Sequence, residues 1–137
     1  FGGLHLAAGQ NPPLSDPSAL CPLPSAFFNG GDIHSFWVTD LKADFNNINS
    51  NTIATEFVGT SISSNGIPYD RVKPYLKDNP YVKFFESRLR GYVKCTVDKE
   101  RWLTDFRAVN TVKYPRSTVK TLASFAVENG RVGARQI

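Results

Sequence analysis

Apolar and polar positions alternate most regularly between residues 92 and 109. In YVKCTV (92–97) and RWLTDFRAV (101–109) an apolar or small residue occupies every second position, and the polar stretch DKE lies between the two segments. An alternation of period two on both sides of a short polar break is typical of a β-hairpin. We therefore predict a hairpin with one apolar face, on which Cys95 is a buried small side chain rather than a nucleophile.

Three further segments have the composition of strands, and one has that of a helix. Residues 35–45 (SFWVTDLKADF) are aromatic and β-branched, residues 52–63 (TIATEFVGTSIS) are apolar enough for burial on both faces, and residues 121–128 (TLASFAVE) end at an Asn-Gly turn. Residues 68–80 predict one short helix, which Pro74 bends or limits to a turn or two. We thus expect a β-rich α/β fold with about five or six strands. Five large aromatic residues are expected to be core material: Trp37, Phe84, Phe85, Trp102 and Phe106.

Both ends of the chain lack such a pattern. Residues 1–29 are rich in proline and serine and have no helical or alternating period. Each proline removes a backbone donor, which excludes an ordinary helix or a central strand there. We expect residues 1–29 to be irregular, with ordered structure starting near Phe27, and residues 131–137 to form a tail.

Composition and charge narrow the function classes. The net charge is +4, but the basic residues are spread along the chain, without the clustered patch or stacking motif of a nucleic-acid-binding module. No apolar run approaches the ~20 residues of a membrane span. Cys21 and Cys95 have no C-x-x-C spacing, so a zinc knuckle is not predicted. The chain begins with Phe and contains no Met, and we therefore expect it to be a fragment.

The stretch NGGDIHSFW (29–37) carries the most suggestive chemistry. Asp32 and His34 follow a pair of glycines, which allow a tight turn or the close approach of a ligand. A carboxylate and an imidazole two residues apart are suitable ligands for a divalent metal ion or for iron. The alternative is a structural turn, in which the aspartate shapes the loop and the histidine donates to a backbone carbonyl.

Other polar residues have simpler interpretations. His5 has no partner pattern, and Asp40 and Asp44 fall at a strand end and a turn, where aspartate is common. Arg88 and Arg90 can contact a phosphate bidentately, or they can serve packing and solvation on a strand face. The GTS of residues 59–61 has no Walker pattern around it.

Several blocks of this sequence, taken together, resemble one known family. GGDIHSFWVTDLKADF, ATEFVGTSISSNG, NPYVKFFESRLRGYVKCTV with RWLTDFRAV, and TLASFAVENGRVGA closely resemble, in this order, the C-terminal portion of the alkaline phosphatase D (PhoD-like) metallophosphatases. The resemblance covers about residues 30 to 134 and leaves out residues 1–29. It implies that residues 30–137 are the C-terminal part of a PhoD-like domain, within the four-layer α/β sandwich of the calcineurin-like metallophosphoesterases.

The same resemblance implies a function and a site. Such enzymes hydrolyse phosphate esters with bound metal ions, calcium and iron in the best-known type, and are periplasmic or secreted. The family's G-D-x-H loop maps onto Asp32 and His34 as metal ligands. Glu56, Thr60 and Ser61 are expected near the metal or the phosphate.

Two functional hypotheses follow. In the first, the chain is part of a metal-dependent phosphatase whose other ligands lie in the N-terminal half of the family domain, so that this chain alone is inactive. In the second, the chain is a non-catalytic, β-rich binding or structural remnant. In either case a sheet without its partner half exposes an edge and an apolar face, and we expect the isolated chain to self-associate.

Overall fold

The structure, a computed structural model, describes residues 26–137 and contains eight strands and one helix in that range. The strands are β1 (Ala26–Gly30), β2 (Phe36–Lys42), β3 (Thr52–Val58), β4 (Val82–Glu86), β5 (Arg90–Val97), β6 (Arg101–Val109), β7 (Val119–Glu128) and β8 (Arg135–Gln136). The helix is α1 (Tyr69–Leu76), and it contains Pro74 as expected. Among the described residues, no helix is long and apolar enough to cross a membrane.

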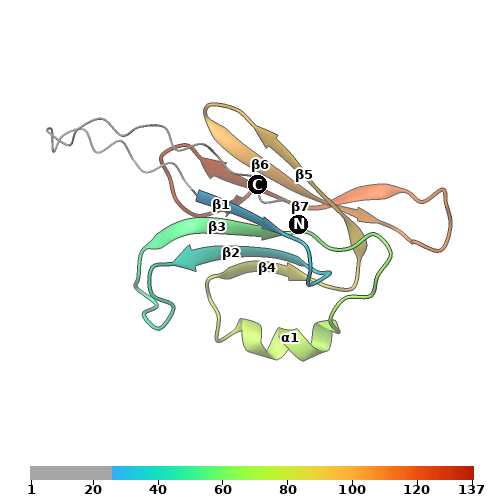
Figure 1. Ribbon diagram of the computed structural model, residues 1–137, viewed down its shortest axis with the longest axis horizontal. Helices are drawn as coiled ribbons and strands as arrows, with labels where there is room; N and C mark the ends of the chain where they lie inside the picture. Colours follow the sequence, from blue (N-terminus) through green and yellow to red (C-terminus); the bar gives the residue numbers. More distant parts are fainter. Residues whose placement is uncertain (1–25) are drawn as a thin grey trace, which may run out of the picture.

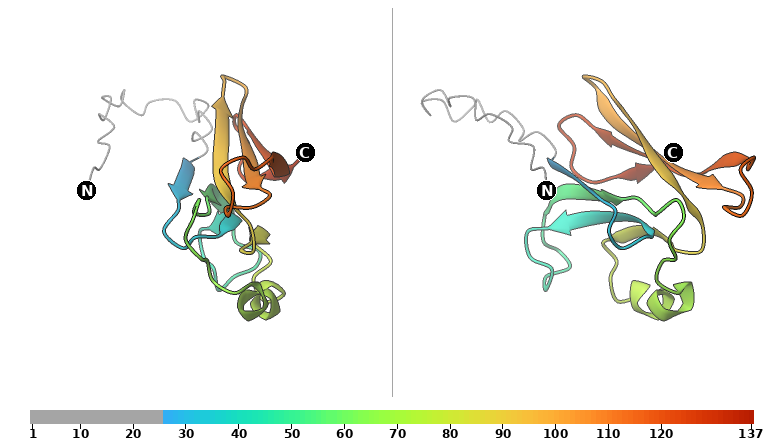
Figure 2. Two further views of the ribbon diagram at one scale, coloured as in Figure 1. Left: turned by 90° about the vertical axis from the view of Figure 1, so that its right-hand side faces the viewer. Right: turned by 45° about the vertical axis from the view of Figure 1, so that its right-hand side comes forward.

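The strands form two four-stranded sheets. Sheet A has the order β1-β3-β2-β4, and sheet B has the order β5-β6-β7-β8 (Figure 1). Within sheet A, β1 runs parallel to β3, while β2 is antiparallel to both of its neighbours. The helix α1 lies on the side of sheet A that faces away from sheet B, as the turned views also show (Figure 2). A β-rich α/β fold with one short helix is therefore confirmed.

The core lies between the two sheets and is built from aromatic rings. Phe106, on β6, is fully buried, and its ring centroid lies 5.3 Å from that of Phe36 and 5.4 Å from that of Phe84, both on sheet A. Phe125 on β7 and Phe57 on β3 complete the cluster around it at 6.0 Å and 6.4 Å. Edge-to-face and tilted pairs at these distances add to the stabilisation from apolar burial. The strand alternation of period two places these rings on the inner faces.

The opposite face of sheet A packs against α1. Trp37 on β2 contacts Phe85 on β4 at 4.3 Å between ring centroids, and Tyr69 of α1 stacks on Phe85 at 5.4 Å. A hollow of about 440 Å³ remains between the sheet and the helix, and it is lined mainly by apolar residues, including Trp37, Val58 and Val72. Trp37 and Phe85 thus pack beneath α1, whereas Phe84, Trp102 and Phe106 belong to the core between the sheets.

The hairpin is confirmed, but the predicted burial of Cys95 is wrong. β5 and β6 pair from Arg90 opposite Val109 to Val97 opposite Trp102. Cys95 is exposed, and so is Val97 at the end of the strand. Their face of the strand is the inner one, since Val93 on the same face packs against the core. Alternation predicts which face a side chain is on, and it does not predict how far the opposing sheet extends.

Both ends of the described chain are more regular than expected. Residues 26–29, assigned to the irregular segment, belong to β1, which pairs with the sequence-predicted strand β3. The expected tail contains β8, which extends sheet B beside Phe125 and Ala126. His5, Cys21 and the remainder of the proline-rich segment lie outside the described residues.

Asp40 has a structural role, as expected from its position on β2. Its Oδ2 lies 2.7 Å from Nζ of Lys83 on β4, and its Oδ1 accepts the backbone N–H of Ala134 at 3.2 Å. Lys83 also donates to the carbonyl oxygen of Ala134 at 2.7 Å. This buried carboxylate therefore fastens the C-terminal segment to sheet A. Asp44 shapes a surface turn, where its Oδ1 accepts the N–H of Asn46.

Candidate functional site

The stretch from Gly31 to Ser35 is the turn between β1 and β2. The parallel strands β1 and β3 end at the same edge of sheet A, and the N–H of Gly59 donates to the carbonyl oxygen of Gly30 at 2.9 Å. Residues that follow β1 therefore lie beside residues that follow β3. This topology brings Asp32 and His34 to the same edge as Thr60 and Ser61.

His34 is held from three sides. Its backbone has φ of 56°, a left-handed conformation that is uncommon for a residue with a side chain. Its carbonyl oxygen accepts hydrogen bonds from Oγ1 of Thr60 at 2.9 Å and from Nη1 of Arg90 at 3.1 Å. Its ring Nδ1 lies 3.2 Å from the carbonyl oxygen of Asn65. Because a carbonyl oxygen only accepts, Nδ1 carries a proton in this contact, and in the neutral ring Nε2 therefore has the lone pair.

This ring contact is compatible with both interpretations of the loop. A histidine donating to a backbone carbonyl is what a structural turn predicts. It is also the arrangement in which histidine binds metal, since a carbonyl on one ring nitrogen fixes the tautomer and leaves the other nitrogen to the ion. Asp32 is exposed at the same turn, where its carboxylate is open to solvent.

The predicted neighbours divide into two groups. Thr60 and Ser61 lie beside the loop, where Ser61 Oγ donates to the carbonyl oxygen of Ser64 at 2.5 Å. Glu56 lies in the middle of β3 opposite Thr39 and lines the hollow beneath α1. The structure thus brings Thr60 and Ser61 into the network around His34, whereas Glu56 lines the hollow beneath α1 together with Ile33 of the turn.

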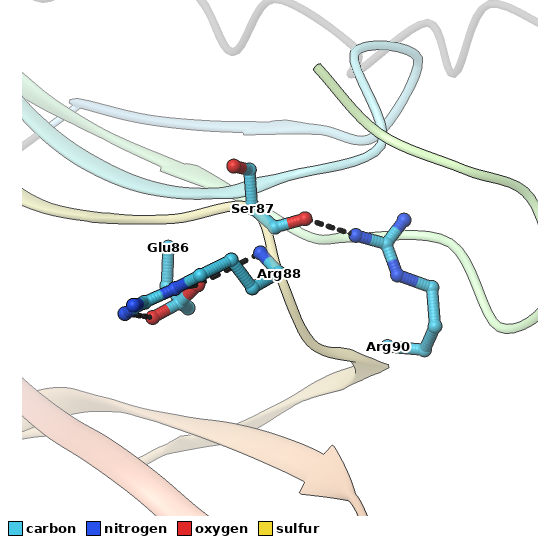
Figure 3. A network of polar contacts seen from close by, with 4 residues as sticks. All are labelled: Glu86, Ser87, Arg88 and Arg90. Atoms are coloured by element: carbon cyan, nitrogen blue, oxygen red, sulfur yellow. Dashed lines mark hydrogen bonds and ion pairs between the residues drawn. The ribbon is translucent and has the colours of Figure 1, made fainter. Parts of the chain in front are cut away.

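Arg88 and Arg90 have separate partners. Figure 3 shows both arginines with Glu86 and Ser87. Arg88 forms a bidentate pair with Glu86, with Nε at 2.9 Å and Nη2 at 2.6 Å from the two carboxylate oxygens. Its guanidinium also lies over the ring of Tyr69, 4.1 Å from the centroid. Arg90 instead donates to backbone carbonyls, one of them that of Ser87. Both arginines also line one open hollow of about 370 Å³, together with Asn65.

The surroundings of Glu86 and Arg90 shift the pKa values of these two side chains. The hydrogen bonds from Arg88 lower the pKa of the Glu86 carboxyl, although burial acts in the opposite direction. Burial lowers the pKa of the Arg90 guanidinium, which nevertheless remains charged at every pH at which a protein is folded.

The Glu86–Arg88 pair gives a prediction for acid stability. A carboxyl whose pKa is lowered in the native state stabilises the fold above its unfolded pKa, and this contribution is lost as the pH falls through the native value. We expect the free energy of unfolding to decrease below about pH 4.5, the ordinary pKa of this glutamate. Glu86→Gln should lower the free energy of unfolding at neutral pH by about 1 kcal/mol, a small loss because Arg88 is largely exposed to solvent. The variant should also show a weaker dependence of stability on acid pH.

Urea unfolding between pH 7 and pH 3 measures this, with Glu128→Gln as the control. Glu128 carries a looser surface pair, 3.6 Å from Arg135. If Glu86→Gln follows the wild-type curve down to acid pH, the Glu86–Arg88 pair is not the group responsible.

Sequence reasoning missed two positions around His34. Asn65 supplies the carbonyl for the ring, and Gly66 allows the chain to pass close by, since a Cβ there would lie 2.2 Å from the carbonyl oxygen of His34. The Asn65-Gly66 pair was visible in the sequence only as a break after a strand. In the part of the chain that the structure describes, no three His, Cys, Asp or Glu side chains gather into a metal cluster.

Comparison with known proteins now adds to this geometry. A model of the PhoD-like phosphatase family matches residues 25–106. Alkaline phosphatase D of Bacillus subtilis (strain 168) is 38% identical over 110 residues, which are 78% of this chain and 19% of that protein. A solved structure described as "Structure of PhoD" superposes with a TM-score of 0.72 at 37% identity and covers 81% of this chain and 22% of its own. The chain therefore spans about a fifth of the relatives that it matches, and the family match begins at residue 25, within the segment that we expected to differ from the family.

Proposed function

This chain belongs to the PhoD-like phosphatase family, and from that premise we propose that Asp32 and His34 supply part of the metal site of an enzyme that hydrolyses phosphate esters. One observation carries the proposal. The His34 ring is fixed through Nδ1 by the carbonyl of Asn65, so Nε2 is free to bind an ion two residues away from the exposed carboxylate of Asp32. By resemblance, we extend the proposal to phosphomonoesters and phosphodiesters as substrates and to an exported enzyme.

The donor set fits a metal ion in part. A carboxylate and a neutral imidazole suit calcium, iron and similar ions, and calcium and iron are the ions that we propose. An ion takes about four to eight ligands, and the described residues bring no third His, Cys, Asp or Glu to these two. The remaining ligands would come from outside the described residues.

When bound, such an ion would polarise a phosphate oxygen and lower the pKa of a bound water to about 7. Asp32 offers a negative charge at the open side of the turn, and His34 offers the lone pair of Nε2. Thr60 and Ser61 have another role, because their hydroxyl groups donate to the carbonyl oxygens of His34 and Ser64. In our proposal these two hydroxyl groups stabilise the turn. Glu56 lines the hollow beneath α1, which Ile33 of the turn also lines.

The proposal is tested by grafting. We would replace, in alkaline phosphatase D of Bacillus subtilis, the segment to which this chain aligns with the aligned residues of this chain, and measure phosphate release from an aryl phosphate ester. We expect the graft to be active. Asp32→Ala and His34→Ala should each lower kcat/KM by more than about 100-fold, since losing even a group that supports a ligand costs about 10- to 100-fold.

Asp44→Ala is the matched control, because Asp44 is an exposed carboxylate in a turn remote from this edge of the sheet. If the Asp32 and His34 variants are as active as Asp44→Ala, the assignment of these two residues to the metal site fails. If the folded graft itself is inactive, the phosphatase assignment fails. The chain would then be better described as a non-catalytic, β-rich module.

A further inference from the structure

We propose that Arg90 is a positioning residue of this site, whose guanidinium holds the turn of His34 against the segment that carries the carbonyl of Asn65. The role rests on the proposed function, since it matters for catalysis only if His34 binds an ion. This positioning role differs from the direct phosphate contact that arginine often makes in proteins.

The hydrogen bonds of Arg90 go to three segments: the β1–β2 turn, the segment after β3 and the segment after β4. Nη1 lies 3.1 Å from the carbonyl oxygen of His34, 3.1 Å from Oγ of Ser61 and 2.6 Å from the carbonyl oxygen of Ser64. Nη2 donates to the carbonyl oxygen of Ser87. A planar guanidinium presents its donors in a fixed fork, so one side chain can bind several carbonyls in a set geometry. Arg90 therefore ties the β1–β2 turn to the segment after β3.

These hydrogen bonds of Arg90 fix the position of the His34 imidazole. The carbonyl that receives Nδ1 belongs to Asn65, the residue after Ser64, so Arg90 holds the backbone of the histidine and the position of its ring acceptor together. The left-handed backbone of His34 adds to the need for support, because such a conformation is strained for a residue with a side chain and persists only where its surroundings fix it. The hydroxyl group of Thr60, two residues after β3, also donates to the carbonyl oxygen of His34.

A phosphate-binding role fits Arg90 less well. All of its recorded hydrogen bonds go to oxygen atoms of the protein, and the side chain is half-buried behind the turn. Arg90 borders a hollow of about 370 Å³, but its Nη1 and Nη2 atoms already donate to oxygen atoms of the protein. Arg88 is more exposed, but its charge is balanced by Glu86.

The metal-free chain itself provides the first test. It contains two histidines, so the ring ¹⁵N resonances of His34 are readily separated from those of His5. At the alkaline end of a pH titration, the neutral ring of His34 should be in the Nδ1–H tautomer. Arg90→Gln should shift it toward the Nε2–H tautomer. Arg88→Gln, which removes the pair with Glu86 and the contact with Tyr69, should leave it unchanged.

A wild-type ring in the Nε2–H form would overturn the proposal without any variant, and so would a folded Arg90→Gln chain that keeps the wild-type tautomer. The second readout is the graft described above. There Arg90→Gln should lower bound metal and kcat/KM by about 10- to 100-fold, and Arg88→Gln should not. If the unmodified graft is inactive while the tautomer responds to Arg90, the proposed function fails and the positioning of His34 stands. If the graft is active and the tautomer does not respond, Arg90 has no such role.

Discussion

Phe106→Ala is expected to lower the free energy of unfolding by about 3–5 kcal/mol, the usual cost of removing a buried phenyl ring. Phe106 is fully buried, and its ring contacts Phe36, Phe57 and Phe84 from sheet A as well as Phe125 from its own sheet. Its removal would leave a cavity at the junction of the sheets, which the neighbouring rings cannot close without moving both backbones. A small domain has only about 5–15 kcal/mol of stability, so this single change approaches the whole of it.

Phe45→Ala is the matched control, since Phe45 is half-exposed and contacts only Tyr81 among the described rings. Surface substitutions of this kind usually change stability by about 0.5 kcal/mol. Urea unfolding followed by tryptophan fluorescence gives both values. Equal losses for the two variants would show that the sheets do not pack around Phe106 as described.

Gly66→Ala is the substitution with the largest expected effect on the site. Its Cβ would lie 2.2 Å from the carbonyl oxygen of His34 and 3.1 Å from Nη2 of Arg90. The first contact is with backbone, so residues 65 and 66 must move away from His34. We expect a loss of about 1–3 kcal/mol in stability, typical of overpacking. The ring Nδ1 of His34 should lose its acceptor, with the same change of tautomer as in Arg90→Gln.

Gly31→Ala is the control within the same network. The nearest atom to its added Cβ would be the carbonyl oxygen of Gly59 at 3.9 Å, an ordinary van der Waals contact. Thermal unfolding and the ¹⁵N spectrum of His34 would separate the two variants. A Gly66→Ala chain with wild-type stability and tautomer would mean that the segment does not pass this close to His34.

The local sequence predicted the strands better than their arrangement. The alternation in residues 92–109 gave the hairpin and the face of each side chain correctly, because that pattern depends on the pleat alone. The exposure of Cys95 could not be predicted in the same way, since it depends on where sheet A ends beneath the hairpin. Strands β1, β4 and β8 were missed because each is short and owes its strand conformation to a partner strand, which is β3, β2 and β7 respectively.

The candidate site, too, was predicted from the sequence only in part. The pair Asp32 and His34 was visible as a motif, and Thr60 and Ser61 were expected nearby from the resemblance to the family. The contacts that fix His34 come from residues 26 to 56 positions away, namely Thr60, Asn65 and Arg90. Such contacts depend on the parallel pairing of β1 with β3 and on the return of the chain through β5. No local pattern distinguishes Arg90, which binds the His34 turn, from Arg88, which binds Glu86.

The measurement that tests the central claim most directly is the metal content of the graft. Metal bound per molecule would be determined by elemental analysis for the unmodified graft, the Asp32→Ala/His34→Ala variant and the Asp44→Ala control. If the turn after β1 supplies metal ligands, the double variant should lose bound metal and phosphate release together, while the control keeps both. A folded double variant that retains its metal and its activity would contradict the assignment of Asp32 and His34.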